Sequence, residues 1–176
     1  MNVWHDIPQQ YITSGKFLVY ITMQKGSNKK YEFDLRTGYL RLAEILYSAA
    51  CYPVNGGIIP RTLNGLQRPQ RALIICQESL ELHTLVECSP VGVIRIRENG
   101  RVEEVIMALP ILENMNGIGF VDSESTLKAM YEEIQYFYQT YNGSADSGLW
   151  INGEISGIKA VDMIEKATVN YIEQYK

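Results

Sequence analysis

Short β-prone segments separated by turn residues constrain the fold of this chain more than any other feature. Within residues 16–110, such segments lie at 16–22, 31–35, 71–76, 85–88, 91–96 and 105–109. Glycine, asparagine and proline punctuate them at 25–28, 37–38, 55–57, 64–65, 89–90 and 99–100. Many short strands at such spacing predict a closed or nearly closed, mostly antiparallel β-barrel.

The spacing of apolar residues changes in the last third of the chain. Apolar and aromatic side chains there recur at steps of three and four: Leu127, Met130, Tyr131, Ile134, Phe137, Tyr138 and Tyr141. This spacing predicts an amphipathic helix near residues 124–142, with Ser123 or Ser125 as its N-cap. A short strand-like segment at 149–151 and a second helix near residues 156–175 follow.

These patterns together predict a single α+β domain over residues 1–176: a small closed antiparallel barrel with two C-terminal helices. Hydrophobic residues make up 46% of the chain and charged residues 20%, which is typical of a folded soluble protein. The net charge of −4 gives no reason to expect a nucleic-acid partner. We see neither an apolar run of membrane-spanning length nor a signal-peptide pattern, and so expect a cytoplasmic protein without a membrane partner.

Several segments resemble the family I soluble inorganic pyrophosphatases. They are Lys25-Gly26-Ser27, Lys30-Tyr31-Glu32, Leu46-Tyr47-Ser48, Tyr52-Pro53 and Ile59-Pro60-Arg61-Thr62. The resemblance extends over nearly the whole chain. It implies an oligonucleotide-binding-like barrel with two helices on its outside, and a homo-oligomer, either a trimer or a hexamer. In that family, carboxylates hold magnesium ions, while Lys, Arg and Tyr side chains hold the phosphates.

The resemblance places residues of a different kind at the metal-binding positions. Leu66, Arg68 and Arg71 stand where the family has three aspartates. Glu98 and Glu103 stand at a second acidic pair, each one methylene longer than aspartate. Since guanidinium groups repel cations, we expect no metal and no cofactor here. Magnesium on Glu98 and Glu103 is a weak alternative.

The phosphate-binding positions are retained in part. The candidate catalytic residues are Lys30, Glu32, Tyr52, Glu98 and Tyr141. The candidate ligand-binding residues are Arg68, Arg71, Glu44, Asn55, Glu103 and Asn142. At the remaining family positions, Thr22 replaces a glutamate, Glu44 an arginine, Gly56 a tyrosine, and Val105 and Asn142 lysines.

The two arginines allow three interpretations. They can pair with Glu98 and Glu103 and close the cavity, they can bind a carboxylate or phosphate bidentately, or their segment can loop into solvent. Other candidates also have a structural alternative. Lys30 and Glu32 can form a cross-strand charge pair, and Tyr52 and Tyr141 can simply be packed.

Cysteine and histidine are weaker candidates. Cys51 could be a nucleophile beside the pocket, but a cysteine on an apolar β-segment is more often inert core. His83 lies in a predicted hairpin turn. The chain has three cysteines without a CxxC pair and two isolated histidines, which indicates neither a zinc site nor a disulfide framework.

Three functions follow from these patterns. The first is a metal-independent pocket that binds an anionic small molecule or transforms it by acid/base chemistry, as a lyase, isomerase or cyclase would. The second is residual divalent-metal-dependent hydrolysis of diphosphate. The third is a non-catalytic binding protein. The first is the main prediction, with efficient magnesium-dependent diphosphatase activity not expected.

Overall fold

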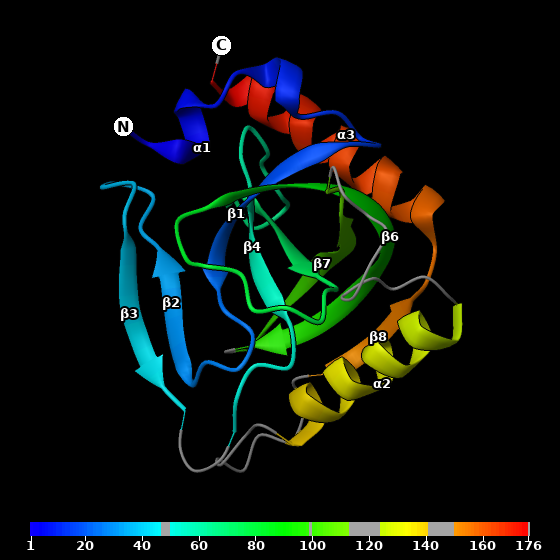
Figure 1. Ribbon diagram of the computed structural model, residues 1–176. Helices are drawn as coiled ribbons and strands as arrows, with labels where there is room; N and C mark the ends of the chain where they lie inside the picture. The colour runs from blue at the N-terminus through cyan, green and yellow to red at the C-terminus, as the bar shows by residue number, and fades with distance from the viewer. Residues whose placement is uncertain (47–49, 99, 113–123, 141–149, 176) are drawn as a thin grey trace.

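The computed structural model describes residues 1–46, 50–98, 100–112, 124–140 and 150–175. Its helices are α1 (Val3–Asp6), a 3-10 turn (Gln9–Tyr11), α2 (Glu124–Thr140) and α3 (Gly157–Gln174). Its strands are β1 (Phe17–Met23), β2 (Lys29–Phe33), β3 (Leu40–Ile45), β4 (Asn55–Ile59), β5 (Gln70–Ile74), β6 (Leu85–Glu98), β7 (Arg101–Pro110) and β8 (Trp150–Glu154). Figure 1 shows the strands curled into a ring, with α2 and α3 on its outside.

Strand β1 closes the ring because it is hydrogen-bonded along both edges. It pairs antiparallel with β4, where Tyr20 faces Ile58, and with β6, where Phe17 faces Cys88. The order β1-β4-β5-β7-β6 then returns to β1, and β8 adds to β6. The β5–β7 pair is parallel, whereas the other pairs in this sheet are antiparallel. The predicted fold class is confirmed, with this one parallel pairing added.

Strands β2 and β3 form a separate two-stranded sheet. Figure 1 shows this hairpin standing beside the ring. One edge of β2 pairs with β3, and the described residues offer its other edge no strand partner. The seam between this hairpin and the ring is where a cavity forms.

Alternation along the strands divides the core into two apolar clusters. On β5, Leu73 belongs to a cluster that includes Ile134 and Phe137 of α2. Its neighbours Ala72 and Ile74 belong to a second cluster, which includes Ile164 of α3. Each helix therefore covers a different apolar cluster, as side chains of period two require. β5 is buried on both sides, as its short apolar run predicts.

The two long helices lie where the sequence predicts them. The side chain of Ser156 caps α3 by accepting a hydrogen bond from the Lys159 backbone N–H at 3.4 Å. Ser125 lies inside α2 rather than at its cap. Ser123, the other predicted cap, lies outside the described residues. No described helix combines the length and the hydropathy needed to span a bilayer.

The sequence prediction was wrong at two places in the sheet. Residues 55–57 form the first half of strand β4, not a turn, and they are fully buried. The glycines are needed because a Cβ on Gly57 would overlap the carbonyl oxygen of Tyr20. Residues 85–88 and 91–96 form one long strand, β6, whose pairing with β7 shifts register between Pro90 and Gly92.

We expect Gly57→Ala to lower the free energy of unfolding by about 1–3 kcal/mol or more, because its Cβ must push β1 and β4 apart. Urea unfolding measures this effect. Gly15→Ala is the matched control, because a Cβ there meets nothing within 4 Å. Equal unfolding midpoints for the two variants would show that the β1–β4 approach is not tight.

Candidate functional site

A cavity of about 710 Å³ opens between the β2–β3 hairpin and the wall of the ring. Its cationic lining residues are Lys30, Arg36, Arg41, Arg68, Arg71 and Arg101. Its carboxylates among the described residues are Glu32, Asp34 and Glu103. These side chains leave an excess of three positive charges, although the chain as a whole carries −4. Such a local field attracts anions.

Asn64 holds the loop that precedes β5. Its side-chain oxygen accepts hydrogen bonds from the backbone N–H groups of Leu66, at 2.9 Å, and Arg68, at 3.2 Å. Its backbone N–H donates to the carbonyl oxygen of Arg68 at 2.8 Å. Gln70 then anchors the start of β5 by donating to the carbonyl oxygen of Glu104 at 2.8 Å. The backbone of this segment is therefore held against the ring, although Gly65, Gln67 and Arg68 are exposed to solvent.

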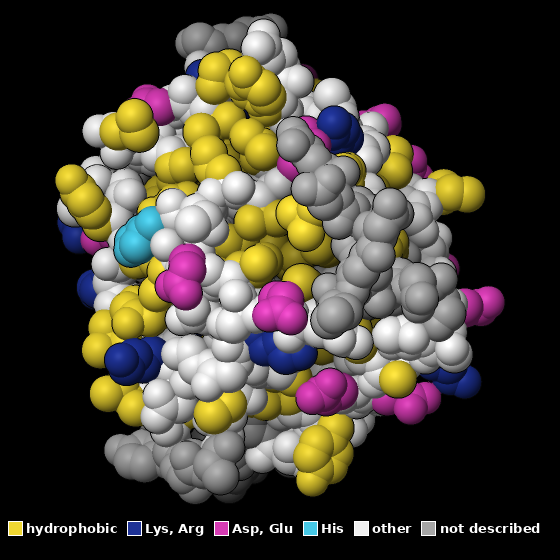
Figure 2. Space-filling model, viewed as in Figure 1, with side chains coloured by type: hydrophobic (Ala, Val, Ile, Leu, Met, Phe, Trp, Pro, Cys, Tyr) yellow, Lys and Arg dark blue, Asp and Glu magenta, His cyan; other side chains and the backbone are white. Residues whose placement is uncertain are grey.

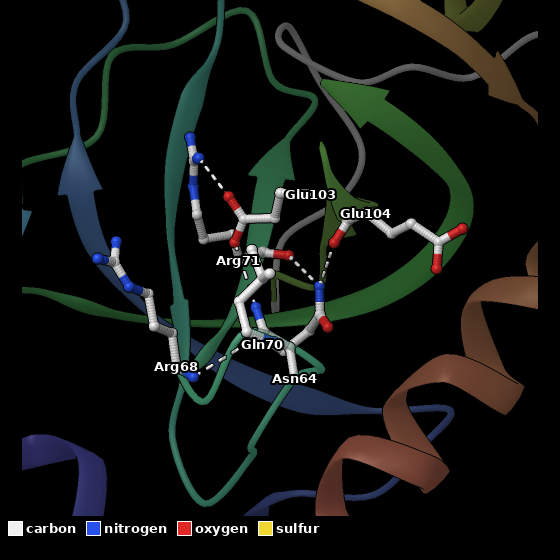
Figure 3. A network of polar contacts seen from close by, with 7 residues as sticks. Asn64, Arg68, Gln70, Arg71, Glu103 and Glu104 are labelled. Carbon is white, nitrogen blue, oxygen red and sulfur yellow. Dashed lines mark hydrogen bonds and ion pairs between the residues drawn. The ribbon is translucent and has the colours of Figure 1, made fainter. Parts of the chain in front are cut away.

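Arg71 forms an ion pair across the sheet. Its Nη1 lies 2.8 Å from Oε2 of Glu103, and the two side chains are 30% and 13% exposed. The other oxygen of Glu103 accepts a hydrogen bond from the Asn64 amide at 3.2 Å. Figure 3 shows the three side chains converging. Arg71 thus adopts the pairing of the first interpretation, with Glu103 as its partner.

Arg68 behaves differently from Arg71. Figure 3 shows its side chain directed away from Glu103. Arg68 is exposed and lines the cavity, and its guanidinium has no ion-pair or hydrogen-bond partner among the described residues. Its guanidinium is therefore available to an anion from solution, as the second interpretation requires. Arg71 therefore fits the first interpretation, whereas the exposed side chain of Arg68 is compatible with the second.

The hairpin supplies the opposite wall of the cavity. Glu32 on β2 faces Arg41 on β3 in the strand register, with 3.5 Å between carboxylate and guanidinium. Asp34 ends β2 and accepts hydrogen bonds from the backbone N–H groups of Arg36, at 2.9 Å, and Thr37, at 3.2 Å. These hydrogen bonds are the main cause of the lowered pKa of Asp34, with the positive charges of Arg36 and Arg41 adding to the effect.

The structure brings together part of the predicted site. Lys30, Glu32 and Tyr52 line the same cavity as the two arginines and Glu103. Tyr52 is buried and its ring lies 5.3 Å from that of Phe137, so it is also part of the core. Glu32 forms an ion pair with Arg41, rather than the charge pair with Lys30 that was the structural alternative. The catalytic roles of these residues stay predictions.

Two predicted ligand-binding residues do not line the cavity. Asn55 is fully buried, and its side chain bonds to three backbone groups: the N–H groups of Lys25 and Leu80 and the carbonyl of Glu78. This satisfied amide ties two loops to β4. Glu44 faces Lys30 across the hairpin and is exposed to solvent. Tyr141, Asn142 and the Glu98 side chain lie outside the described residues.

The cysteines and His83 lie away from the cavity lining. Cys51 is exposed, which corrects its assignment to the core, whereas Cys76 and Cys88 are buried. Burial is the first cause that raises the pKa of the Cys88 thiol to about 12. His83 lies in a turn, as predicted, and its Nδ1 is 2.6 Å from the Tyr20 hydroxyl.

Sequence reasoning missed three cations and one carboxylate of the cavity: Arg36, Arg41, Arg101 and Asp34. The resemblance gave no signal for them, because it marks only positions that match a family motif. Three of the four, Asp34, Arg36 and Arg41, lie on the β2–β3 hairpin. Once β2 and β3 are paired around the turn at Thr37 and Gly38, the charges near that turn face the ring.

The described residues do not fit a cluster of magnesium ions. Within them, no group of three or more His, Cys, Asp or Glu side chains is placed to hold a metal. Each cavity carboxylate already has partners: Glu103 contacts Arg71 and Asn64, Glu32 contacts Arg41, and Asp34 accepts backbone N–H groups. Magnesium would have to displace a guanidinium from Glu103 or Glu32.

The fold and the site define a small five-stranded barrel with a positively charged side cavity, and comparisons identify its family. Residues 19–176 match the family model described as inorganic pyrophosphatase. The chain therefore belongs to the inorganic pyrophosphatase family.

Individual relatives agree with this assignment. An inorganic pyrophosphatase of Helicobacter pylori is 30% identical over 158 residues, 87% of this chain and 90% of the relative. Soluble inorganic pyrophosphatase 1 of Arabidopsis thaliana is 27% identical, over 97% and 80% of the two chains. The solved structure from Thermus thermophilus superposes with a TM-score of 0.81 over 98% and 99% of the chains, at 22% identity. This last likeness shows the fold alone.

We expect Arg71→Ala to lower the free energy of unfolding by about 1–3 kcal/mol, because Glu103 would keep a poorly solvated carboxylate without its cation. Thermal and urea unfolding measure this. Arg95→Ala is the control, since Arg95 pairs with Glu104 at 2.9 Å with both side chains over a third exposed. Its cost should stay below about 1 kcal/mol. Equal costs would show that the Arg71–Glu103 pair adds no more than a surface pair.

Proposed function

We propose that the cavity binds a small anion that carries phosphoryl groups, with guanidinium groups as its principal contacts. The observation that carries this proposal is the excess of three positive charges on the lining of one cavity. Arg68 and Arg101 strengthen it, because neither has an ion-pair partner among the described residues. A guanidinium binds phosphate through two parallel hydrogen bonds and needs no metal to do so.

Membership of the family supports phosphate as the anion. The relatives from Helicobacter pylori and Arabidopsis thaliana are named as pyrophosphatases, which favours diphosphate. Magnesium-dependent hydrolysis of inorganic diphosphate is accordingly the second candidate function. The acid/base alternative depends on Glu32 or Glu103 acting as a base. Both carboxylates already contact a guanidinium group, Arg41 for Glu32 and Arg71 for Glu103, so either would have to leave that partner to reach a substrate proton.

The surface supports a small ligand rather than nucleic acid. On the face that Figure 2 shows, Lys and Arg side chains are scattered among Asp and Glu and form no extended basic patch. The cavity lining, in contrast, carries an excess of three positive charges, and its volume suits a small molecule. We therefore propose an anionic small molecule, with no required cofactor, as the partner of this site.

Arg68→Ala should weaken binding of diphosphate about tenfold, the loss expected for charge-assisted hydrogen bonds. Calorimetric titration in EDTA measures the affinity, and the unfolding temperature should not change, since Arg68 contributes no ion pair to the fold. Arg95→Ala, which removes a cation outside the cavity, should bind diphosphate as the parent protein does. Absence of binding to the parent protein, with and without magnesium, would refute the proposal.

The same samples test the second candidate function. Phosphate release with magnesium, manganese or zinc is measured beside the Helicobacter pylori enzyme. We expect binding without metal and weak release. Diphosphate that binds only in the presence of magnesium, with release comparable to that enzyme, would replace the metal-independent proposal by diphosphate hydrolysis.

We also propose that the protein assembles as a trimer or hexamer. Helix α2 offers little apolar surface for such a contact, because Met130, Ile134, Phe137 and Tyr138 are buried in the barrel's own core. Exposed apolar side chains occur instead along α3, where Ile158 is 79% and Val169 is 52% exposed.

Light scattering at micromolar concentration should therefore give three or six times the mass of one chain. Ile158→Lys should reduce that mass if α3 forms the contact, whereas Tyr136→Lys, which changes an exposed residue of α2, should not. A parent protein that scatters as a monomer would refute the assembly.

A further inference from the structure

The cavity is larger than its cationic groups need for inorganic diphosphate. At about 710 Å³ it lies within the range of sites that enclose drug-sized molecules, roughly 300–1,000 Å³. Apolar and aromatic side chains contribute to the same lining, among them Tyr31, Leu35 and Leu66. An anion made of phosphoryl groups alone would leave these apolar surfaces without a contact.

Tyr31 differs from the other aromatic residues of the lining. Phe33 packs edge-on against Tyr20 with 6.1 Å between ring centroids, and Tyr52 lies 5.3 Å from Phe137. Tyr31 is half-buried on β2, yet its side chain has neither a ring contact nor a hydrogen bond with another described residue. A half-buried ring in a cavity lining, without a ring partner among the described residues, can stack on a ligand.

Strand β4 contributes backbone to the wall of the cavity. Two of its successive residues, Gly56 and Gly57, are among the lining residues. Their place in the strand is fixed by packing, because a Cβ on Gly56 would lie 2.8 Å from the Met23 methyl and one on Gly57 would overlap β1. The cavity therefore combines a backbone wall, an aromatic ring and several guanidinium groups.

We propose that the preferred ligand is a nucleoside phosphate, in which a planar ring stacks on Tyr31 and the phosphoryl groups contact the arginines. This inference rests on the proposed phosphate-binding function and names its ligand class. Aromatic side chains bind nucleobases through their faces, and guanidinium groups can both stack and bind phosphate. No covalent step is involved.

Calorimetric titration with ADP, inorganic diphosphate and geranyl diphosphate tests the inference, in EDTA and again with magnesium. We expect ADP to bind at least about tenfold more tightly than diphosphate, since one stacked base contributes an effect of this size. Tyr31→Ala should remove that difference and leave the affinity for diphosphate unchanged, whereas Tyr31→Phe should preserve it.

Tyr39→Ala is the matched control. Tyr39 lies on the same hairpin, 70% exposed and outside the cavity lining, so this variant should bind both ligands as the parent protein does. The unfolding temperature of each variant shows that it is folded, and Tyr31→Leu, which keeps an apolar side chain without a ring, replaces Tyr31→Ala if that variant unfolds.

The outcomes separate this inference from the proposed function. The nucleoside phosphate is refuted as the preferred ligand if diphosphate binds as tightly as ADP. It is refuted equally if Tyr31→Ala keeps the preference for ADP. In both cases the proposed phosphate site remains. If geranyl diphosphate binds more tightly than ADP, the site prefers an apolar chain to a planar ring, and the inference that a planar ring stacks on Tyr31 is refuted. If none of the three ligands binds the parent protein, both the phosphate site and its ligand class are refuted.

Discussion

The pairing of β1 along both of its edges is the constraint on which the rest of the molecule depends. It joins β4 to β6 and turns the sheet into a ring, which removes most of the unpaired strand edges that an open sheet would expose. Ring closure also uses both edges of β1 and β4, so the β2–β3 hairpin cannot join the ring through either strand. The side cavity is a consequence of that exclusion.

Positive charge in this cavity has a physical consequence for the unliganded protein. Guanidinium groups that face one another across a partly enclosed space repel, and the repulsion grows where water is scarce. Two of them are neutralised locally, Arg71 by Glu103 and Arg41 by Glu32. Arg68 and Arg101 have no ion-pair partner among the described residues, so an anion that binds beside them also stabilises the fold. Anion binding in the cavity is therefore coupled to the free energy of unfolding.

The sequence predicts the fold well because its evidence is local and repeated. A short apolar run locates β5, and spacing at steps of three and four locates α2 and α3, without knowledge of their partners. The errors arise where tertiary packing overrides local preference. Gly56 and Gly57 favour a turn in isolation, but in the ring they allow β4 to approach β1. Pro90 marks an interruption in pairing that a bulge absorbs without ending the strand.

The candidate site is less predictable because it combines residues from separate elements. The resemblance finds Lys30, Arg68 and Arg71, which stand at family positions, but it gives no information about Arg36 or Arg101. Nor does the sequence decide how the two neighbouring arginines divide their roles. That depends on where Glu103 lies on β7, the parallel neighbour of β5, which becomes known only once the strand order is known.

Arg68 and Arg71 illustrate how one fold can hold two neighbouring arginines in different ways. Function depends on the residues of a site, and a barrel retained at about 30% identity to a named pyrophosphatase leaves those residues free to differ. Here Arg71 is held against Glu103 and contributes to the wall, which keeps the adjoining loop in position through Asn64. Arg68, held by its backbone in that loop, can extend into the cavity without weakening the core. The ion-paired Arg71 thus helps to order, through Glu103 and Asn64, the loop from which the exposed Arg68 side chain reaches the cavity lining.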